Sequence, residues 1–307
     1  MASSRTSYSQ YCAELASRGY VVAAVEHRDG SAPGSVIMEI DGTKKRVFHI
    51  TPDQLQRKDS PPDVEGLKAA QLGLRQAEVE ETVRVLRNIN KGAGGPIYDH
   101  NPRREGSDLA SWHGRLATDD ITVVGHSYGA TLALQTLKDA PSKKLPIKGG
   151  IILDPGKQSG PSNDIVDVPI LVLHSNSWSK KHSVFYSRPH FDVVGDLVQG
   201  VLDKGEAAWF MTSIDTTHPS VTDAPLIEPL LLSWTTGATI DVYKGVDMYV
   251  RVSEEFLRFQ RTGRRTGLLA QTVSHPKYDK AVPEASLPEQ WKNEWQVHVA
   301  PRKGREG

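Results

Sequence analysis

The chain has 307 residues, of which 38% are hydrophobic and 24% are charged, the balance of an ordinary globular protein. Its 37 basic and 37 acidic side chains cancel, so no net charge favours nucleic acid or an anionic membrane. A single cysteine, Cys12, excludes an intrachain disulfide and a cysteine zinc cluster.

No apolar run approaches the roughly 18 residues that a membrane-spanning helix needs. The first residues are polar and lack the apolar segment of a secretory signal, so a cytoplasmic location is expected. The residues give no indication of the oligomeric state.

The N-terminal third predicts a helix, a strand and an excursion from the core. Residues 5–18 carry apolar side chains three and four positions apart, which is typical of an amphipathic helix. Residues 20–25 are continuously apolar and favour a strand buried on both faces of a parallel sheet. Residues 26–31 then form a charged cluster, and open α/β sheets bind ligands where their strands end. Residues 31–64 contain a predicted hairpin around Asp41-Gly42 and leave the core.

The remainder alternates helices and strands. Residues 66–90 predict a long amphipathic helix that ends at a glycine-rich stretch, residues 92–96. Further strands are predicted at 121–124, 149–154, 168–174 and 207–213, and further helices at 130–137, 192–203 and 241–260. This alternation predicts one α/β domain over residues 1–307, a doubly wound and mostly parallel sheet flanked by helices, with a loosely packed C-terminal tail from about residue 272.

The central motif is Gly125-His126-Ser127-Tyr128-Gly129, which stands between a predicted strand and a predicted helix. In that context Gly-x-Ser-x-Gly indicates a nucleophile elbow, a strained turn that lifts the serine hydroxyl above the sheet. We expect both glycines to be required because strand and helix pass close to each other there. The alternative is a chance occurrence of the pentapeptide in a turn.

The partners of the serine follow from chain order, since this class of site runs nucleophile, acid, histidine. Asp154 ends a predicted strand after the motif, and His218 follows the last parallel strand. In this interpretation Ser127 attacks an acyl carbon, His218 carries the proton, and Asp154 orients the imidazole.

Other residues compete for these roles. The alternative to a catalytic role is a loop acid for Asp154 and a surface histidine for His218. His126 is interpreted as a packing or hydrogen-bonding residue beneath the serine. The other candidates are Asp164, Asp167 and Asp192 for the acid, and His27 and His174 for the base. A metal site from His27, His174 and His190 lacks a ligand spacing that would support it, so no metal and no cofactor are predicted.

Residues 14–32, which include Glu26-His27-Arg28-Asp29, closely resemble the plasma and type II platelet-activating factor acetylhydrolases. The serine motif resembles their elbow, where an aromatic residue follows the serine. The resemblance extends over roughly residues 5–260. It implies an α/β-hydrolase fold and a calcium-independent serine esterase that cleaves short or oxidised sn-2 acyl chains from phospholipids. Carried over, the nucleophile is Ser127, the acid Asp154 and the base His218.

In this family the oxyanion is bound by two backbone N–H groups. The resemblance assigns the first to Tyr128 and aligns the second with Met1 or Ala2. Because the family's first sheet strands and a His-Gly loop would precede Met1, we expect the first strands to be absent. We further expect that a longer form exists or that activity is weak, as one lost donor costs about 10²–10³ in rate.

Two alternatives remain, a generic short-chain carboxylesterase and a catalytically impaired, hydrolase-like binding protein. The expected partner is a phospholipid substrate, with transient contact at a membrane surface and no nucleic acid. Ile165, Val166, Trp178, Phe185, Tyr186 and Phe191 offer apolar surface near the site, but we expect most of them to belong to the core or to line the pocket.

Overall fold

The structure, a computed structural model, describes residues 5–54, 63–157, 159–160, 162–180, 183–185, 187–282 and 287–302. The chain divides into two compact units. One is built mainly from Val21–Ile121 with Ser142–Pro146, and the other contains Tyr8–Tyr20, Thr122–Pro141 and Ile147–Gly307. The single domain expected from the sequence stays a prediction.

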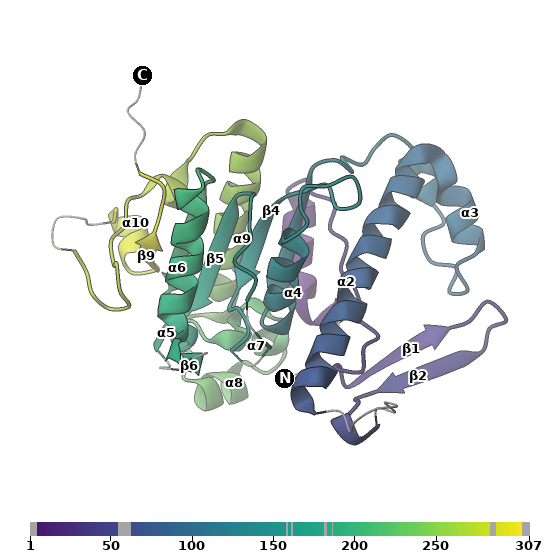
Figure 1. Cartoon of the computed structure of the whole chain (residues 1–307), viewed down its shortest axis with the longest axis horizontal. Coiled ribbons are helices and arrows are strands. Elements are labelled where there is room, and N and C mark those ends of the chain that lie inside the picture. Colours follow the sequence, from purple (N-terminus) through teal and green to yellow (C-terminus); the bar gives the residue numbers. More distant parts are fainter. Residues whose placement is uncertain are drawn as a thin grey trace. The chain divides into compact units, whose positions relative to one another are not determined.

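The larger unit is built on a five-stranded sheet with the order β3-β4-β5-β8-β9 (Figure 1). Its strands are β3 (Ile121–His126), β4 (Ile147–Leu153), β5 (Ile170–Ser175), β8 (Ala208–Ser213) and β9 (Trp295–Val299). β4 and β5 pair in parallel, β5 and β8 pair in parallel, and β9 is antiparallel to β8. The parallel strands are buried along almost their whole length, as expected for a sheet covered on both faces.

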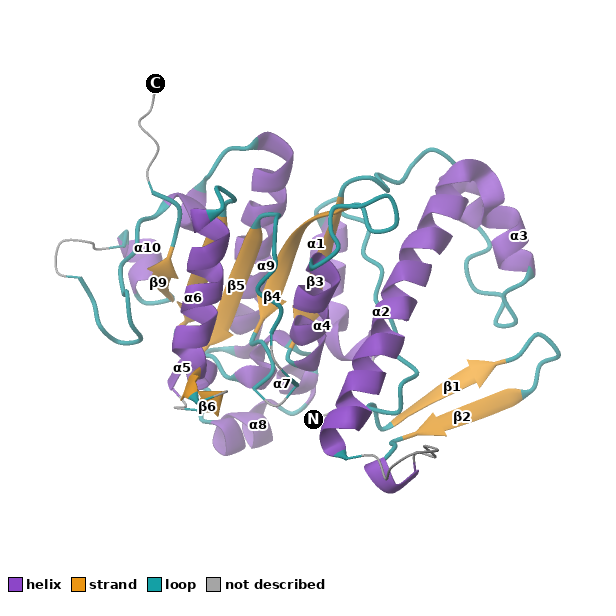
Figure 2. Cartoon of the chain, viewed as in Figure 1, coloured by secondary structure: helices purple, strands orange, loops and turns teal. Residues whose placement is uncertain are grey.

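Helices cover both faces of this sheet (Figure 2). The helices of this unit are α1 (Ser9–Ser17), α4 (Tyr128–Leu137), α5 (Asn176–Lys180), α6 (His190–Asp203), α7 (Ala224–Ile227), α8 (Pro229–Thr236), α9 (Val242–Thr262) and α10 (Glu289–Lys292). α4 and α6 lie in front of the sheet in Figure 2, and α1 and α9 lie behind it. The main core cluster joins the apolar stripes of α1 and α9 to alternate strand residues such as Leu153, Leu173 and Met211.

Shorter elements complete the chain. They are the two-residue strands β6 (Val184–Phe185) and β7 (Arg188–Pro189), the 3₁₀ turns at Arg5–Tyr8, Pro52–Gln54, Leu109–Trp112, His218–Val221 and Gly267–Ala270, and a π-helical turn at Ile89–Ala93.

The smaller unit contains the predicted hairpin and the predicted long helix. The hairpin is β1 (Gly34–Met38) and β2 (Lys44–Phe48), and the helix is α2 (Val64–Asn88). α2 ends at Asn88 and is followed by the π-helical turn. Gly92 in that turn has a non-helical backbone with φ 100°, so the glycine-rich stretch interrupts the helix as predicted, and the short helix α3 (Gly94–Asp99) follows.

The charged cluster at residues 26–31 is paired with α2. The Arg75 guanidinium lies 2.5 Å from the Asp29 carboxylate, and Glu78 accepts hydrogen bonds from His27 and Arg28. Burial alone would raise the pKa of Asp29, but hydrogen bonding and charge from Arg75 outweigh it and lower the pKa. The cluster therefore serves the packing of this unit, and the expectation of a ligand-binding edge there is not supported by these contacts.

Two predictions about sheet strands are wrong. Residues 20–25 form no strand, and the side chain of Val21 is 57% exposed. An apolar run becomes a strand only where a neighbour accepts its backbone hydrogen bonds, and residues 20–25 belong to no sheet in the described part of the chain. The prediction of a loosely packed tail from about residue 272 is also wrong for β9. Trp295, which the sequence suggests as an anchor of the tail, and Val297 are buried against the sheet.

Candidate active site

Ser127 occupies a strained turn between β3 and α4. Its backbone has φ 58° and ψ −117°, a conformation that non-glycine residues rarely adopt, and its N–H donates to the Leu153 carbonyl at 2.9 Å. A Cβ on Gly125 would lie 2.0 Å from the Gly129 carbonyl oxygen, so Gly125 is sterically required. A Cβ on Gly129 would meet nothing within 4 Å, so the expectation that both glycines are required is wrong for Gly129.

Asp154 follows the last residue of β4 and is 3% exposed. Its backbone also has a positive φ, 45°. One carboxylate oxygen accepts the Ser175 N–H at 2.6 Å, and the other accepts the Ser175 hydroxyl at 2.7 Å. Such bonds stabilise the ionised carboxylate where water has been removed.

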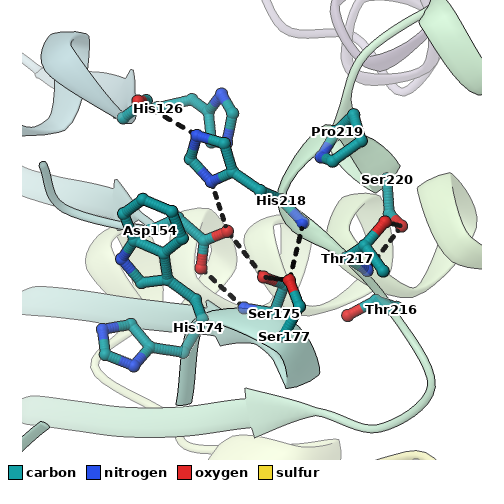
Figure 3. Close-up of polar contacts among 12 residues, drawn as sticks. His126, Asp154, His174, Ser175, Ser177, Thr216, Thr217, His218, Pro219 and Ser220 are labelled. Carbon is teal, nitrogen blue, oxygen red and sulfur yellow. Dashed lines mark hydrogen bonds and ion pairs between the residues drawn. The ribbon is translucent and has the colours of Figure 1, made fainter. Parts of the chain in front are cut away.

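His218 begins the 3₁₀ turn after β8 and joins the other two residues (Figure 3). Its Nδ1 lies 2.9 Å from Asp154 Oδ2, and its Nε2 lies 3.1 Å from Ser127 Oγ. The structure therefore brings the three predicted site residues into one hydrogen-bonded line. This arrangement is able to transfer a proton from the serine to the imidazole while the carboxylate faces the resulting cation.

The competing candidates lie elsewhere or have other partners. Asp167 pairs with Lys204 at 3.0 Å. His27 is bound to Glu78 in the smaller unit. His174 is fully buried, and its Nδ1 contacts the Ser179 hydroxyl at 3.1 Å.

His126 lies beside the line formed by Ser127, His218 and Asp154, and its ring contacts the His218 ring. Its Nδ1 is 2.8 Å from the Tyr8 hydroxyl, and its ring centroid lies 4.4 Å from that of His218. Burial, together with the charge of His218, lowers the pKa of His126 to about 3, so the ring is neutral near pH 7. These contacts agree with the expected packing and hydrogen-bonding role.

One group of three close metal-ligand side chains occurs among the described residues, His126, Asp154 and His218, with ligand atoms within 4.8 Å of one another. Zinc ligands bind at about 2.0–2.2 Å. A metal there would have to break the direct hydrogen bond between Asp154 and His218. The donor set therefore suits proton transfer better than metal binding.

Tyr128 is the first residue of α4, directly after the serine. The N-terminus of a helix presents backbone N–H groups and partial positive charge, which favours a developing oxyanion at this position. The second candidate donors, Met1 and Ala2, lie outside the described residues.

Sequence reasoning missed Ser175 and Ser177, and it considered Trp178 only as an apolar side chain near the site, not as a contact of the base. Ser177 Oγ accepts the His218 N–H at 3.1 Å, and the Trp178 ring stacks on the His218 ring. The sequence carried a signal for these residues, because the carboxyl ends of parallel strands meet at one sheet edge, Ser175 ends β5, and Ser177 and Trp178 follow it closely.

A mixed sheet flanked by helices, with a serine on a strained strand-to-helix turn, defines an α/β-hydrolase. Residues 1–266 match the model of the family described as platelet-activating factor acetylhydrolase, isoform II. The chain belongs to this family.

Individual relatives agree with this assignment. The platelet-activating factor acetylhydrolase of Canis lupus familiaris is 30% identical over 135 residues, covering 44% of this chain and 29% of the dog protein. That of Gallus gallus is 28% identical over 173 residues, covering 49% of this chain and 35% of its own length. The matches thus span only about a third of these relatives. No helix among the described residues is long and apolar enough to cross a membrane.

Proposed function

We propose that this chain is a serine esterase that hydrolyses the short or oxidised sn-2 acyl ester of phospholipids. The observation that carries the proposal is the position of His218, within hydrogen-bond distance of both Ser127 and Asp154. The relatives named as platelet-activating factor acetylhydrolases support the choice of a phospholipid ester.

In the proposed reaction, Ser127 Oγ attacks the sn-2 acyl carbon as its proton passes to His218 Nε2. The tetrahedral oxyanion receives a hydrogen bond from the Tyr128 N–H. Collapse of this intermediate breaks the bond to the glycerol oxygen, which takes the proton from His218 and leaves as the lysophospholipid. Water, deprotonated by the same imidazole, then releases the short carboxylate and restores the serine.

A fluorophosphonate probe tests this proposal because it modifies an activated serine covalently. We expect modification of Ser127, its loss in Ser127→Ala, and hydrolysis of a 2-acetyl phospholipid in preference to a long-chain analogue. Equal turnover of acetyl esters with and without a phospholipid headgroup would favour a generic short-chain carboxylesterase. A folded protein that the probe does not modify would favour a hydrolase-like binding protein.

We also propose transient contact with a phospholipid surface through α7 and α8. Three apolar side chains there are strongly exposed, Ile227 at 73%, Leu230 at 86% and Trp234 at 85%. The end of α8 is held beside the site because Thr236 accepts a hydrogen bond from Thr217, the residue before His218. Exposed apolar side chains beside a lipid-cleaving site are suited to insertion at the headgroup level.

This surface differs from the apolar residues considered from the sequence, most of which are expected in the core or lining the pocket. Val166 and Phe185 are buried, Ile165 is 48% exposed, and Tyr186 lies outside the described residues. We expect Trp234→Ser to reduce hydrolysis of vesicle-borne substrate far more than hydrolysis of p-nitrophenyl acetate. The control is Phe48→Ser, which replaces an exposed aromatic residue of the smaller unit. Equal losses with both substrates would argue against the contact. The cytoplasmic location stays a prediction.

A further inference from the structure

The segment from Ser175 to Trp178 contacts both the acid and the base. Ser175 donates twice to Asp154, and Ser177 Oγ accepts the backbone N–H of His218. The two serine hydroxyls are 3.4 Å apart. Figure 3 shows the resulting closed ring, which runs from the imidazole through the carboxylate and both hydroxyls back to the backbone of the same histidine. Acid and base are therefore joined both directly and through this segment.

Trp178 contacts the remaining face of the base. The indole and imidazole rings are nearly parallel, with an interplanar angle of 11° and centroids 4.0 Å apart. The indole is itself fixed, since its Nε1 donates to the Pro155 carbonyl at 3.0 Å. The Lys157 ammonium lies 4.5 Å from the indole centroid and donates to the Trp178 carbonyl at 2.8 Å. The half-buried Trp178 side chain thus has little freedom to leave the histidine.

Stacking suits a catalytic base better than a further hydrogen bond would. Contact through the ring face fixes the imidazole plane and leaves both nitrogens of His218 for Ser127 and Asp154. An indole face also attracts a cation, so it favours the imidazolium that forms when the serine loses its proton. The charged and titratable groups around His218 are the Asp154 carboxylate, the His126 ring and, beyond the indole, Lys157.

We infer that Trp178 and Ser177 are positioning residues, which hold His218 by its ring face and by its backbone so that Nε2 stays directed at Ser127. The inference rests on the proposed function, because it assigns a role to the contacts of the proposed general base. It adds a second source of alignment to the carboxylate of Asp154.

The test compares Trp178→Leu, Trp178→Phe and Ser177→Ala in the full chain, with p-nitrophenyl acetate as the substrate across the pH range of activity. Misalignment by about 1 Å costs up to about 10²-fold, so we expect Trp178→Leu to lower kcat about 10- to 100-fold. Its loss of cation stabilisation should move the acidic limb of kcat/KM to lower pH by about half a unit to one unit. Trp178→Phe should restore most of kcat, because it keeps an aromatic face. Ser177→Ala should lower kcat several-fold, as expected when one hydrogen bond is lost.

Controls separate positioning from folding. Trp112→Leu and Ser111→Ala remove a tryptophan and a serine from the smaller unit and should leave kcat unchanged. Melting temperatures show whether each variant folds, and a purely structural role would lower them without moving the acidic limb. If Trp178→Leu does not fold, the decision rests on Ser177→Ala.

Three results would overturn the inference. The first is a folded Trp178→Leu enzyme with unchanged kcat and pH profile, and the second is a change confined to KM, which would make Trp178 a substrate contact. If Trp178→Leu is unfolded, the third is unchanged kcat in Ser177→Ala. Failure of the proposed function is distinct, because the wild-type protein would then not react with a fluorophosphonate.

Discussion

His190 offers a quantitative test of how burial controls stability. This side chain begins α6, is 2% exposed, and packs against Phe185 at 5.2 Å and His174 at 5.5 Å between ring centroids. Neither ring nitrogen has a hydrogen-bond partner among the described residues. Burial, with the nearby Lys157 charge, lowers the pKa of His190 from 6.5 to about 4.

The direction in which pH changes the free energy of unfolding follows from proton binding. Below about pH 6.5 the unfolded chain binds a proton at His190 and the folded protein does not, so the free energy of unfolding decreases as the pH falls towards about 4. At about pH 5 the loss from this one residue is RT ln(1 + 10^1.5), about 2 kcal/mol. Replacement by phenylalanine removes the titrating group while keeping a ring of similar size.

Urea unfolding at about pH 7.5 and about pH 5 measures the effect. Between these pH values, His190→Phe should lose about 2 kcal/mol less stability than the wild type. His49→Phe is the matched control, because that histidine is exposed and its replacement should leave the difference unchanged. A folded His190→Phe protein with the wild-type pH dependence would refute the reasoning, since another group would then carry the acid sensitivity.

Other predictions concern the site and the smaller unit. Asp154→Asn should lower kcat about 10⁴-fold with little change in substrate affinity, measured by steady-state kinetics. Gly125→Ala should abolish probe labelling or folding because its Cβ would lie 2.0 Å from a carbonyl, whereas Gly129→Ala should retain both; equal behaviour would contradict the elbow geometry. Arg75→Met should destabilise the protein by about 3–5 kcal/mol in urea unfolding, since the fully buried Asp29 carboxylate would lose its partner. Unchanged stability would mean that this pair contributes nothing.

Much of the fold is predictable because its signals are local. Ile151–Leu153 in β4 and Ile170–Leu173 in β5 are apolar runs, and α9 carries an apolar stripe at helical spacing, so each of these elements is evident within its own residues. The strand expected at residues 20–25 failed although its composition was suitable. Pairing depends on a distant partner, and local composition carries no information about it.

The residues of the candidate site likewise fall into those that the sequence identifies and those that only the sheet arrangement identifies. The serine turn is encoded in five adjacent residues, and chain order was enough to select Asp154 and His218 for inspection. The end of β5 pointed to the region of Ser177 and Trp178, but their contacts with His218 are recognisable only when β5 is placed beside β4 and β8. Their residue types alone predict nothing, because serine and tryptophan occur in many unrelated environments.

The antiparallel strand β9 has a consequence for anyone who shortens this protein. The family match stops at residue 266, yet residues 295–299 supply the hydrogen-bonding neighbour along one side of β8. A version trimmed to the family boundary would leave the row of backbone groups beside Phe210 and Met211 without its partner and uncover the apolar surface that Val297 seals. Such a fragment would be prone to self-association through that open border, even with every residue of the triad intact.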